Sequence, residues 1–283
     1  MNCWMFPGQP LKFTPLPSGD ANFQELASIC RMRTGFDPFE SEPESRGKGM
    51  SLHTGLQIHG TIMSLRKTRE LLQSGAVPDI VAQHSMGIYP ALAICGVISE
   101  GDALEMVALV GECMARIFKD EKYALGCAIG IEEPKLRSVI SPHEVYFGNY
   151  NTSRHFLITG KKGDIEAAME AAMGAGAFSV SIHNCDAPLH SPLMAEASGA
   201  LKQIFSDYSY AAPHIPLMSH RGELLEHPEQ IRAFLHDELL EPVFWEKSWH
   251  VLKKTGVDHF IEVGVGETLK KFNRWIESEQ IAR

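Results

Sequence analysis

Ser85 stands where a serine could act as a nucleophile. An apolar segment at 77–82 precedes it and is typical of a short buried strand, and helix-forming residues follow at 87–95. A serine on a tight turn between a strand and a helix, with Gly87 two residues later, is typical of a nucleophile elbow. The N–H of Met86, at the start of the helix, could then stabilise an oxyanion. The simpler alternative is that Ser85 only caps the helix.

His190 is a candidate general base for such a serine. Pro188 and Pro192 restrict the loop around it, directly before a helix expected at 193–205. A neutral imidazole can take a proton from a hydroxyl near neutral pH. A single histidine is more often structural or solvated, so the position of His190 alone does not establish this role.

The elements that would hold these residues alternate between strands and helices. Apolar strands are expected at 3–6, 77–82, 215–218 and 259–263, and helices at 22–32, 51–73, 87–95, 101–118, 193–205, 230–240, 242–255 and 268–275. This alternation, together with the elbow, predicts an α/β fold with an α/β-hydrolase-like core around a parallel sheet.

A different rhythm between residues 122 and 186 predicts an inserted subdomain. Strands are expected at 124–131, 144–150, 156–159 and 177–182, with helices at 133–140 and 165–175. The order β-α-β-β-α-β is that of the ferredoxin-like split unit. We therefore expect a catalytic domain formed by residues 1–121 and 187–283 and a small ferredoxin-like subdomain at 122–186.

Composition excludes several classes of protein. The formal net charge is −9, from 26 basic and 35 acidic residues, which argues against a nucleic-acid-binding surface. The sequence shows neither a secretory signal nor a run of about 20 apolar residues that could cross a membrane. The six cysteines lack a CxxC pair and are expected to be reduced in a cytoplasmic protein, and no group of residues has convincing metal-ligand spacing.

Six landmarks in this order resemble the malonyl-CoA:acyl-carrier-protein transacylase family. They are Phe6-Pro7-Gly8-Gln9, the His84-Ser85-x-Gly87 elbow, the split β-α-β-β-α-β insert, the loop at 189–194, Pro242-Val243-x-Trp245, and Glu262-Val263-Gly264-x-Gly266. Each motif alone is weak, but together they cover nearly the whole chain. They indicate the family far more strongly than they indicate the acyl group.

The resemblance implies a ping-pong acyl transfer from a coenzyme A thioester to the phosphopantetheine arm of an acyl carrier protein. Ser85 would be the nucleophile, and His190 the base, oriented by the backbone carbonyl near Glu238. The amides of Gln9 and Met86 would form the oxyanion hole. The resemblance further implies that no cofactor or metal is bound, and that the protein is a monomer.

The resemblance also suggests residues of the acyl and pantetheine pocket. Gln57 matches a pocket-lining glutamine, and Asn151 matches an asparagine near the mouth for the pantetheine arm. Malonyl-specific members carry an arginine that pairs with the malonyl carboxylate, and its position falls on Val110. An unpaired carboxylate there would cost about 2–5 kcal/mol, so an uncharged acyl group is expected. Pro10 and Gln83 also stand where the family has glycine.

Two other functions remain open at this point. The same Ser-His pair could hydrolyse acyl-carrier-protein thioesters, with water in place of the acceptor thiol. Alternatively, the chain could bind acyl thioesters without catalysis, although the presence of both Ser85 and His190 argues against this. The sequence does not separate transfer from hydrolysis, because the difference lies in whether water reaches the acyl-enzyme.

Overall fold

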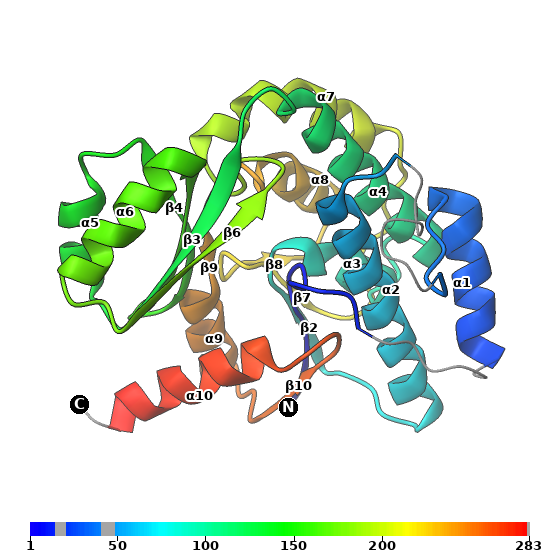
Figure 1. Cartoon of the computed structure of the whole chain (residues 1–283). Coiled ribbons are helices and arrows are strands. Elements are labelled where there is room, and N and C mark those ends of the chain that lie inside the picture. Colours follow the sequence, from blue (N-terminus) through cyan, green and yellow to red (C-terminus); the bar gives the residue numbers. More distant parts are fainter. Residues whose placement is uncertain (15–20, 41–48, 282–283) are drawn as a thin grey trace.

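A computed structural model describes residues 1–14, 21–40 and 49–281, and contains two five-stranded sheets (Figure 1). The strand order of the first sheet is β10-β1-β2-β7-β8. Its members are β1 (Asn2–Phe6), β2 (Ile80–Gln83), β7 (Leu217–Met218), β8 (Leu224–Leu225) and β10 (His259–Glu262). The first four strands in this order are parallel, whereas β8 runs antiparallel to β7. The predicted parallel sheet is therefore a mixed one, because the antiparallel strand β8, which is too short to show in the sequence pattern, adds to its edge.

Helices cover both faces of the first sheet. On one side of the sheet, the larger core is shared by α1 (Ala21–Thr34), α2 (Leu52–Gln73), α3 (Ile88–Ile94), α4 (Glu100–Ile117), α7 (Ala195–Ser206) and α8 (Pro228–Asp237). On the other side lie α9 (Trp245–Lys254) and α10 (Thr268–Ile281). The alternation of side chains along β1 explains the two cores. Trp4 and Phe6 point into the larger core, and Cys3 and Met5 point toward α9 and α10.

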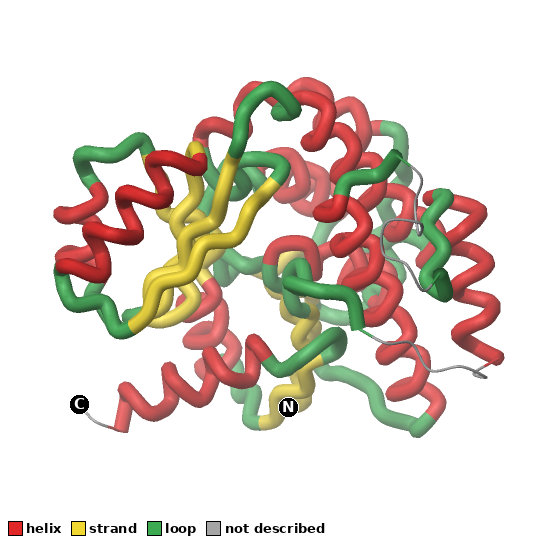
Figure 2. Tube along the Cα trace, in the orientation of Figure 1, coloured by secondary structure: helices red, strands yellow, loops and turns green. Residues whose placement is uncertain are grey.

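The second sheet is built mainly from the inserted segment. Its order is β6-β3-β5-β4-β9, with β3 (Tyr123–Ile129), β4 (Val145–Thr152), β5 (His155–Lys161), β6 (Ser179–Cys185) and β9 (Val243–Phe244). Two helices, α5 (Glu133–Ile140) and α6 (Lys162–Gly174), pack on one face of this sheet (Figure 2). The predicted element order within 122–186 is therefore observed.

Residues 243–244 correct one prediction. The sequence pattern predicts a helix that includes them, but in the structure they pair with Asn149 and Tyr150 as the parallel strand β9. The helix begins only at Trp245. Two β-compatible residues after a proline are too short a signal for a strand, and only the neighbouring edge of β4 makes them one. None of the described helices is long and apolar enough to cross a bilayer.

Candidate active site

The turn between β2 and α3 places Ser85 in an unusual backbone conformation. Ser85 has φ 53° and His190 has φ 58°, and among the described residues these are the only non-glycine residues with positive φ. Such strain is concentrated at functional sites, where the surrounding structure enforces it. At Gly87 the turn requires glycine, because a Cβ there would lie 2.2 Å from the Phe6 carbonyl oxygen. The elbow is thus built by close contact with β1.

A relay of hydrogen bonds connects Ser85, His190 and Glu238. Ser85 Oγ lies 2.7 Å from His190 Nε2, and His190 Nδ1 lies 2.8 Å from the Glu238 carbonyl oxygen. Because a carbonyl can only accept, Nδ1 carries the proton, and Nε2 accepts from the Ser85 hydroxyl. Burial lowers the pKa of His190 to about 4, so the imidazole is neutral near pH 7. The arrangement suits a general base.

The elbow is joined to the second sheet through His84. His84 Nε2 donates to Asn151 Oδ1 at 2.9 Å, and both side chains are buried. Burial lowers the pKa of His84. The family resemblance implies a position for Asn151 near the entry for the pantetheine arm, whereas the structure shows its side chain buried at His84. Its contact with the residue before Ser85 makes it a connection between β4 and the elbow.

Gln9 and Gln57 meet beside the elbow. The loop after β1 carries Gln9, whose Oε1 accepts from Gln57 Nε2 at 3.1 Å. Gln9 Nε2 donates to His53 Nδ1 at 3.0 Å. These two bonds fix the side chain of Gln9. The N–H of Met86 can bind an oxyanion, because the first N–H groups of a helical turn have no acceptor within the helix. Gln9 and Met86, the two residues predicted to form the oxyanion hole, follow the neighbouring strands β1 and β2, so both lie at the same edge of the sheet.

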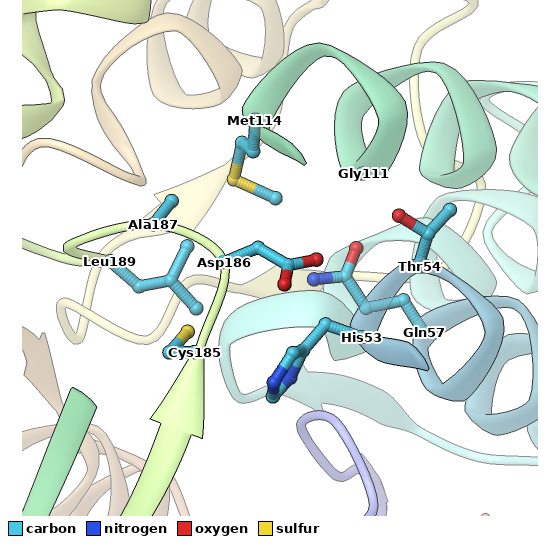
Figure 3. A pocket seen from close by; sticks show the side chains of 9 residues that line it. All are labelled: His53, Thr54, Gln57, Gly111, Met114, Cys185, Asp186, Ala187 and Leu189. Carbon is cyan, nitrogen blue, oxygen red and sulfur yellow. The ribbon is translucent and has the colours of Figure 1, made fainter. Parts of the chain in front are cut away.

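A small pocket lies between α2, α4 and the segment after β6. Figure 3 shows its lining side chains, which are His53, Thr54, Gln57, Gly111, Met114, Cys185, Asp186, Ala187 and Leu189. Gln57 is in this lining. Val110 is buried in the core next to Gly111 and is not among the lining residues.

Asp186 gives this pocket an acidic group that the sequence analysis missed. Its carboxylate accepts a hydrogen bond from Ser51, the N-cap of α2. Burial lowers the pKa of His53, and the Asp186 carboxylate opposes this effect. Within the described ranges no lysine or arginine forms an ion pair with Asp186. The sequence shows Asp186 only as an aspartate four residues before His190. Its contact with Ser51 at the start of α2 depends on the folded chain.

His220 and the side chain of Glu238 were also missed. The Ser85 N–H donates to His220 Nδ1 at 3.2 Å. His190, His220 and Glu238 each place one potential ligand atom within 4.8 Å of the others. His220 Nδ1 already accepts the hydrogen bond of the Ser85 N–H, and His190 Nδ1 donates its own proton to the Glu238 carbonyl. A metal ion needs a free nitrogen lone pair from each ring, so it would break the bonds that hold Ser85 and His190. This cluster therefore does not fit a resident metal.

Comparisons with known proteins agree with this architecture. The acyl transferase domain family matches residues 56–272. Malonyl CoA-acyl carrier protein transacylase of Bacillus subtilis (strain 168) is 27% identical over 293 residues, covering 97% of this chain and 91% of the relative. The protein of the same name from Escherichia coli (strain K12) is 30% identical over 207 residues, covering 70% and 65% of the two chains.

Solved structures share the fold. An acyl-carrier-protein S-malonyltransferase from Burkholderia pseudomallei 1710b superposes with a TM-score of 0.87 at 25% identity, covering 98% of this chain and 93% of the other. A malonyl-transacylase solved in complex with the acyl carrier protein of a type II polyketide synthase has a TM-score of 0.86 at 23% identity, with the same coverage of 98% and 93%.

Proposed function

The chain belongs to the acyl transferase domain family, and from this premise we propose that it moves an acyl group from coenzyme A to the phosphopantetheine thiol of an acyl carrier protein. The observation that carries the proposal is the relay from Ser85 Oγ through His190 to the Glu238 carbonyl, at 2.7 Å and 2.8 Å. A carrier-protein acceptor is supported by the relatives, whose names specify that partner.

In the first half-reaction Ser85 becomes acylated. Its oxygen attacks the thioester carbonyl while His190 Nε2 takes the hydroxyl proton. The amides of Gln9 and Met86 stabilise the tetrahedral oxyanion. The carbon–sulfur bond then breaks, and coenzyme A leaves as a thiol with the proton from His190. Glu238 keeps the ring oriented throughout, because Nδ1 stays hydrogen-bonded to its carbonyl oxygen.

The second half-reaction reverses these roles. The phosphopantetheine thiol gives its proton to His190 Nε2 and attacks the acyl-serine carbonyl. The bond between Ser85 Oγ and the acyl carbon breaks, and the serine oxygen recovers the proton from His190. No net proton is gained or lost, so the neutral His190 that burial favours is regenerated after each transfer.

The acyl group in this proposal carries no carboxylate. Val110 offers no cation where the family's carboxylate-binding arginine falls, and the neighbouring pocket contains the Asp186 carboxylate. A malonyl carboxylate would there lose water without gaining a positive partner, beside a like charge. An acetyl or longer uncharged acyl group has neither disadvantage.

The proposal includes a division of the fold. Residues 1–121 and 187–283, which contain the first sheet and its helices, form an α/β-hydrolase-like catalytic domain, and 122–186 form a ferredoxin-like subdomain whose sheet also takes in β9. The order β6-β3-β5-β4 within the second sheet supports this assignment. All six cysteines are free thiols, which supports a cytoplasmic location.

The test is the intact mass of the protein after incubation with acetyl-, butyryl- and malonyl-CoA, followed by addition of a phosphopantetheinylated carrier protein. We expect an acetyl or butyryl adduct that is absent in Ser85→Ala and that passes to the carrier protein. A malonyl adduct of equal or greater yield would overturn the acyl assignment. Release of free acid without acylated carrier would replace transfer by hydrolysis, and absence of both adduct and free coenzyme A would exclude catalysis of this type.

A further inference from the structure

His220 is a second buried histidine that contacts the strained serine. Its Nδ1 accepts the Ser85 N–H, and its ring packs edge-on against His190 with the ring centroids 5.6 Å apart. Because an N–H donates to Nδ1, the proton of the neutral ring lies on Nε2. This Nε2 is buried and has no hydrogen-bond partner among the described residues.

The carboxyl group of Glu238 is the complementary unpaired group. Both of its oxygens are buried without a hydrogen-bond partner in the described parts of the chain. One of them belongs to the cluster in which ligand atoms of His190, His220 and Glu238 lie within 4.8 Å of one another. Glu238 is thus close to both histidines, because its backbone carbonyl orients His190 and its side chain lies beside His220.

Three hydrogen bonds and one close approach surround Ser85. The bonds join Ser85 Oγ to His190, His190 to the Glu238 backbone carbonyl, and the Ser85 amide to His220. One oxygen of the Glu238 carboxyl lies within 4.8 Å of a ring nitrogen of each histidine. We propose that His220 and the Glu238 side chain are positioning residues, in which His220 anchors the strained Ser85 backbone and ionisation of Glu238 makes His190 a stronger base. This inference rests on the dyad chemistry proposed above.

The surrounding groups decide when Glu238 ionises. Burial raises the pKa of Glu238 to about 8, and Arg221 opposes this effect. Arg221 is itself paired with Glu241. Three other titratable groups lie near the Glu238 carboxyl. The pKa of Tyr89 in α3 is raised well above its usual value, chiefly by burial and further by Glu238. The other two are His190 and His220, whose rings are neutral because burial lowers their pKa. His84 is a further neutral ring, since burial lowers its pKa. Glu238 is therefore the group whose charge changes between pH 7 and 9.

The expected effect follows from Coulomb's law. One negative charge about 6 Å from an imidazole, at an effective dielectric constant of about 20, strengthens its proton affinity about 100-fold. With the proton about half transferred in the transition state, the rate of Ser85 attack rises about tenfold.

The experiment measures Ser85 reactivity without an acyl donor. A fluorophosphonate is incubated with the full chain from pH 5.5 to 9.5, and the rate of covalent labelling is followed by intact mass. We expect the rate constant of the wild-type protein to rise about tenfold through about pH 8. Glu238→Gln should abolish this rise. Glu262→Gln should retain it, because Glu262 is another buried carboxylate but is bonded to the amides of Leu269 and Lys270.

Two variants of His220 separate anchoring from folding. Asparagine can place Oδ1 where His220 Nδ1 accepts the Ser85 N–H, so His220→Asn should label within about threefold of wild type, whereas His220→Leu should label at least tenfold more slowly at every pH. Persistence of the alkaline rise in Glu238→Gln, or wild-type labelling by a folded His220→Leu, would overturn the inference. If wild-type Ser85 failed to label at any pH, the dyad itself would be wrong, and the inference would fall with it.

Discussion

The proposed catalytic centre around Ser85 and the proposed acyl pocket between α2 and α4 are held in different ways. At the centre, backbone geometry fixes the reacting groups: Ser85 and His190 both have positive φ, and a backbone carbonyl orients the imidazole. In the pocket, side chains do this work, through the bonds of Gln9 with His53 and Gln57. Substitutions of these side chains can change the pocket without moving the backbone, so substrate preference can change while the geometry of Ser85 and His190 stays the same.

The two regions also differ in charge. Around the dyad, burial favours the neutral form of each group, lowering the pKa of His190 and His220 and raising that of Glu238. The pocket, in contrast, contains the Asp186 carboxylate, bonded to Ser51 and unpaired with any cation in the described ranges. The neutral groups at the proposed centre suit the transfer of a proton, and in our proposal the charge of Asp186 lets the pocket discriminate between acyl groups.

Removal of the nucleophile should have the largest effect. Ser85→Ala deletes the oxygen that forms the acyl-enzyme, and we expect acylation to fall at least about 10⁴-fold. The measurement is intact mass after incubation with acyl-CoA. Ser64→Ala is the matched control, because Ser64 is also a buried serine, lies on α2, and has no hydrogen-bond partner for its Oγ among the described residues. Normal turnover in Ser85→Ala would show that the elbow is structural.

Removal of the base should have a smaller but still large effect. His190→Ala leaves the oxyanion-stabilising amides in place while removing proton transfer, and we expect acylation to slow about 10²- to 10⁴-fold. Rapid-mixing measurement of coenzyme A release checks this value. A folded His190→Ala variant that retains the wild-type rate would assign the proton transfer to another group, and the comparison between centre and pocket would lose its basis.

The sequence indicated the groups around Ser85 more completely than those around the pocket. Ser85 and His190 stand in local patterns, the elbow and the proline-flanked loop, while the Glu238 carbonyl was implied only by the family resemblance. The structure brings the three within hydrogen-bonding distance. The element order of 122–186 was likewise readable from strand and helix periodicity. The predictions that failed concern features that depend on contacts between distant segments. Val243, for example, forms a strand only because it pairs with Asn149, 94 positions away in the sequence.

The same reason explains the missed side chains. Asp186 contacts Ser51, 135 positions away, and His220 contacts Ser85 at the same separation. Neither residue carries a local motif, since an isolated aspartate or histidine is most often a solvated or structural residue. Asn151 shows the converse, because the family resemblance selected the residue while the buried bond to His84 required the folded chain.

The pH dependence of the free energy of unfolding should show that the buried Glu238 carboxyl is neutral in the folded chain. The pKa of Glu238 is about 8 in the folded chain and has its ordinary value near 4.5 when unfolded, so the folded state binds more protons between these limits. Stability at this group therefore falls as pH rises from about 4.5 to 8. We expect Glu238→Gln to gain about 2–5 kcal/mol relative to wild type between pH 5 and pH 8, measured by urea unfolding. A pH-independent difference would contradict the buried neutral carboxyl.

The pocket can be changed by supplying the missing cation. Val110→Arg alone should have little benefit, because the guanidinium would pair with Asp186 in the adjoining pocket. Val110→Arg combined with Asp186→Ser should raise malonyl relative to acetyl acylation about 30- to 100-fold, because a bidentate carboxylate contact then becomes available. Competition between the two acyl-CoAs, with both adducts resolved by mass, gives the ratio. An unchanged ratio in a folded double variant would show that residue 110 does not face the acyl group.

The smallest expected effect isolates the charge of Asp186. Asp186→Asn keeps the size of the side chain and an oxygen for the Ser51 hydrogen bond, but removes the negative charge from the pocket. A like charge at about 6 Å in a partly solvated pocket is worth about 1 kcal/mol, so malonyl acylation should rise about fivefold while acetyl acylation stays constant. Asp164→Asn, on the first turn of α6, is the control for a change in net charge. An equal gain for both acyl groups would mean that Asp186 acts on packing at α2, and that the pocket does not discriminate by charge.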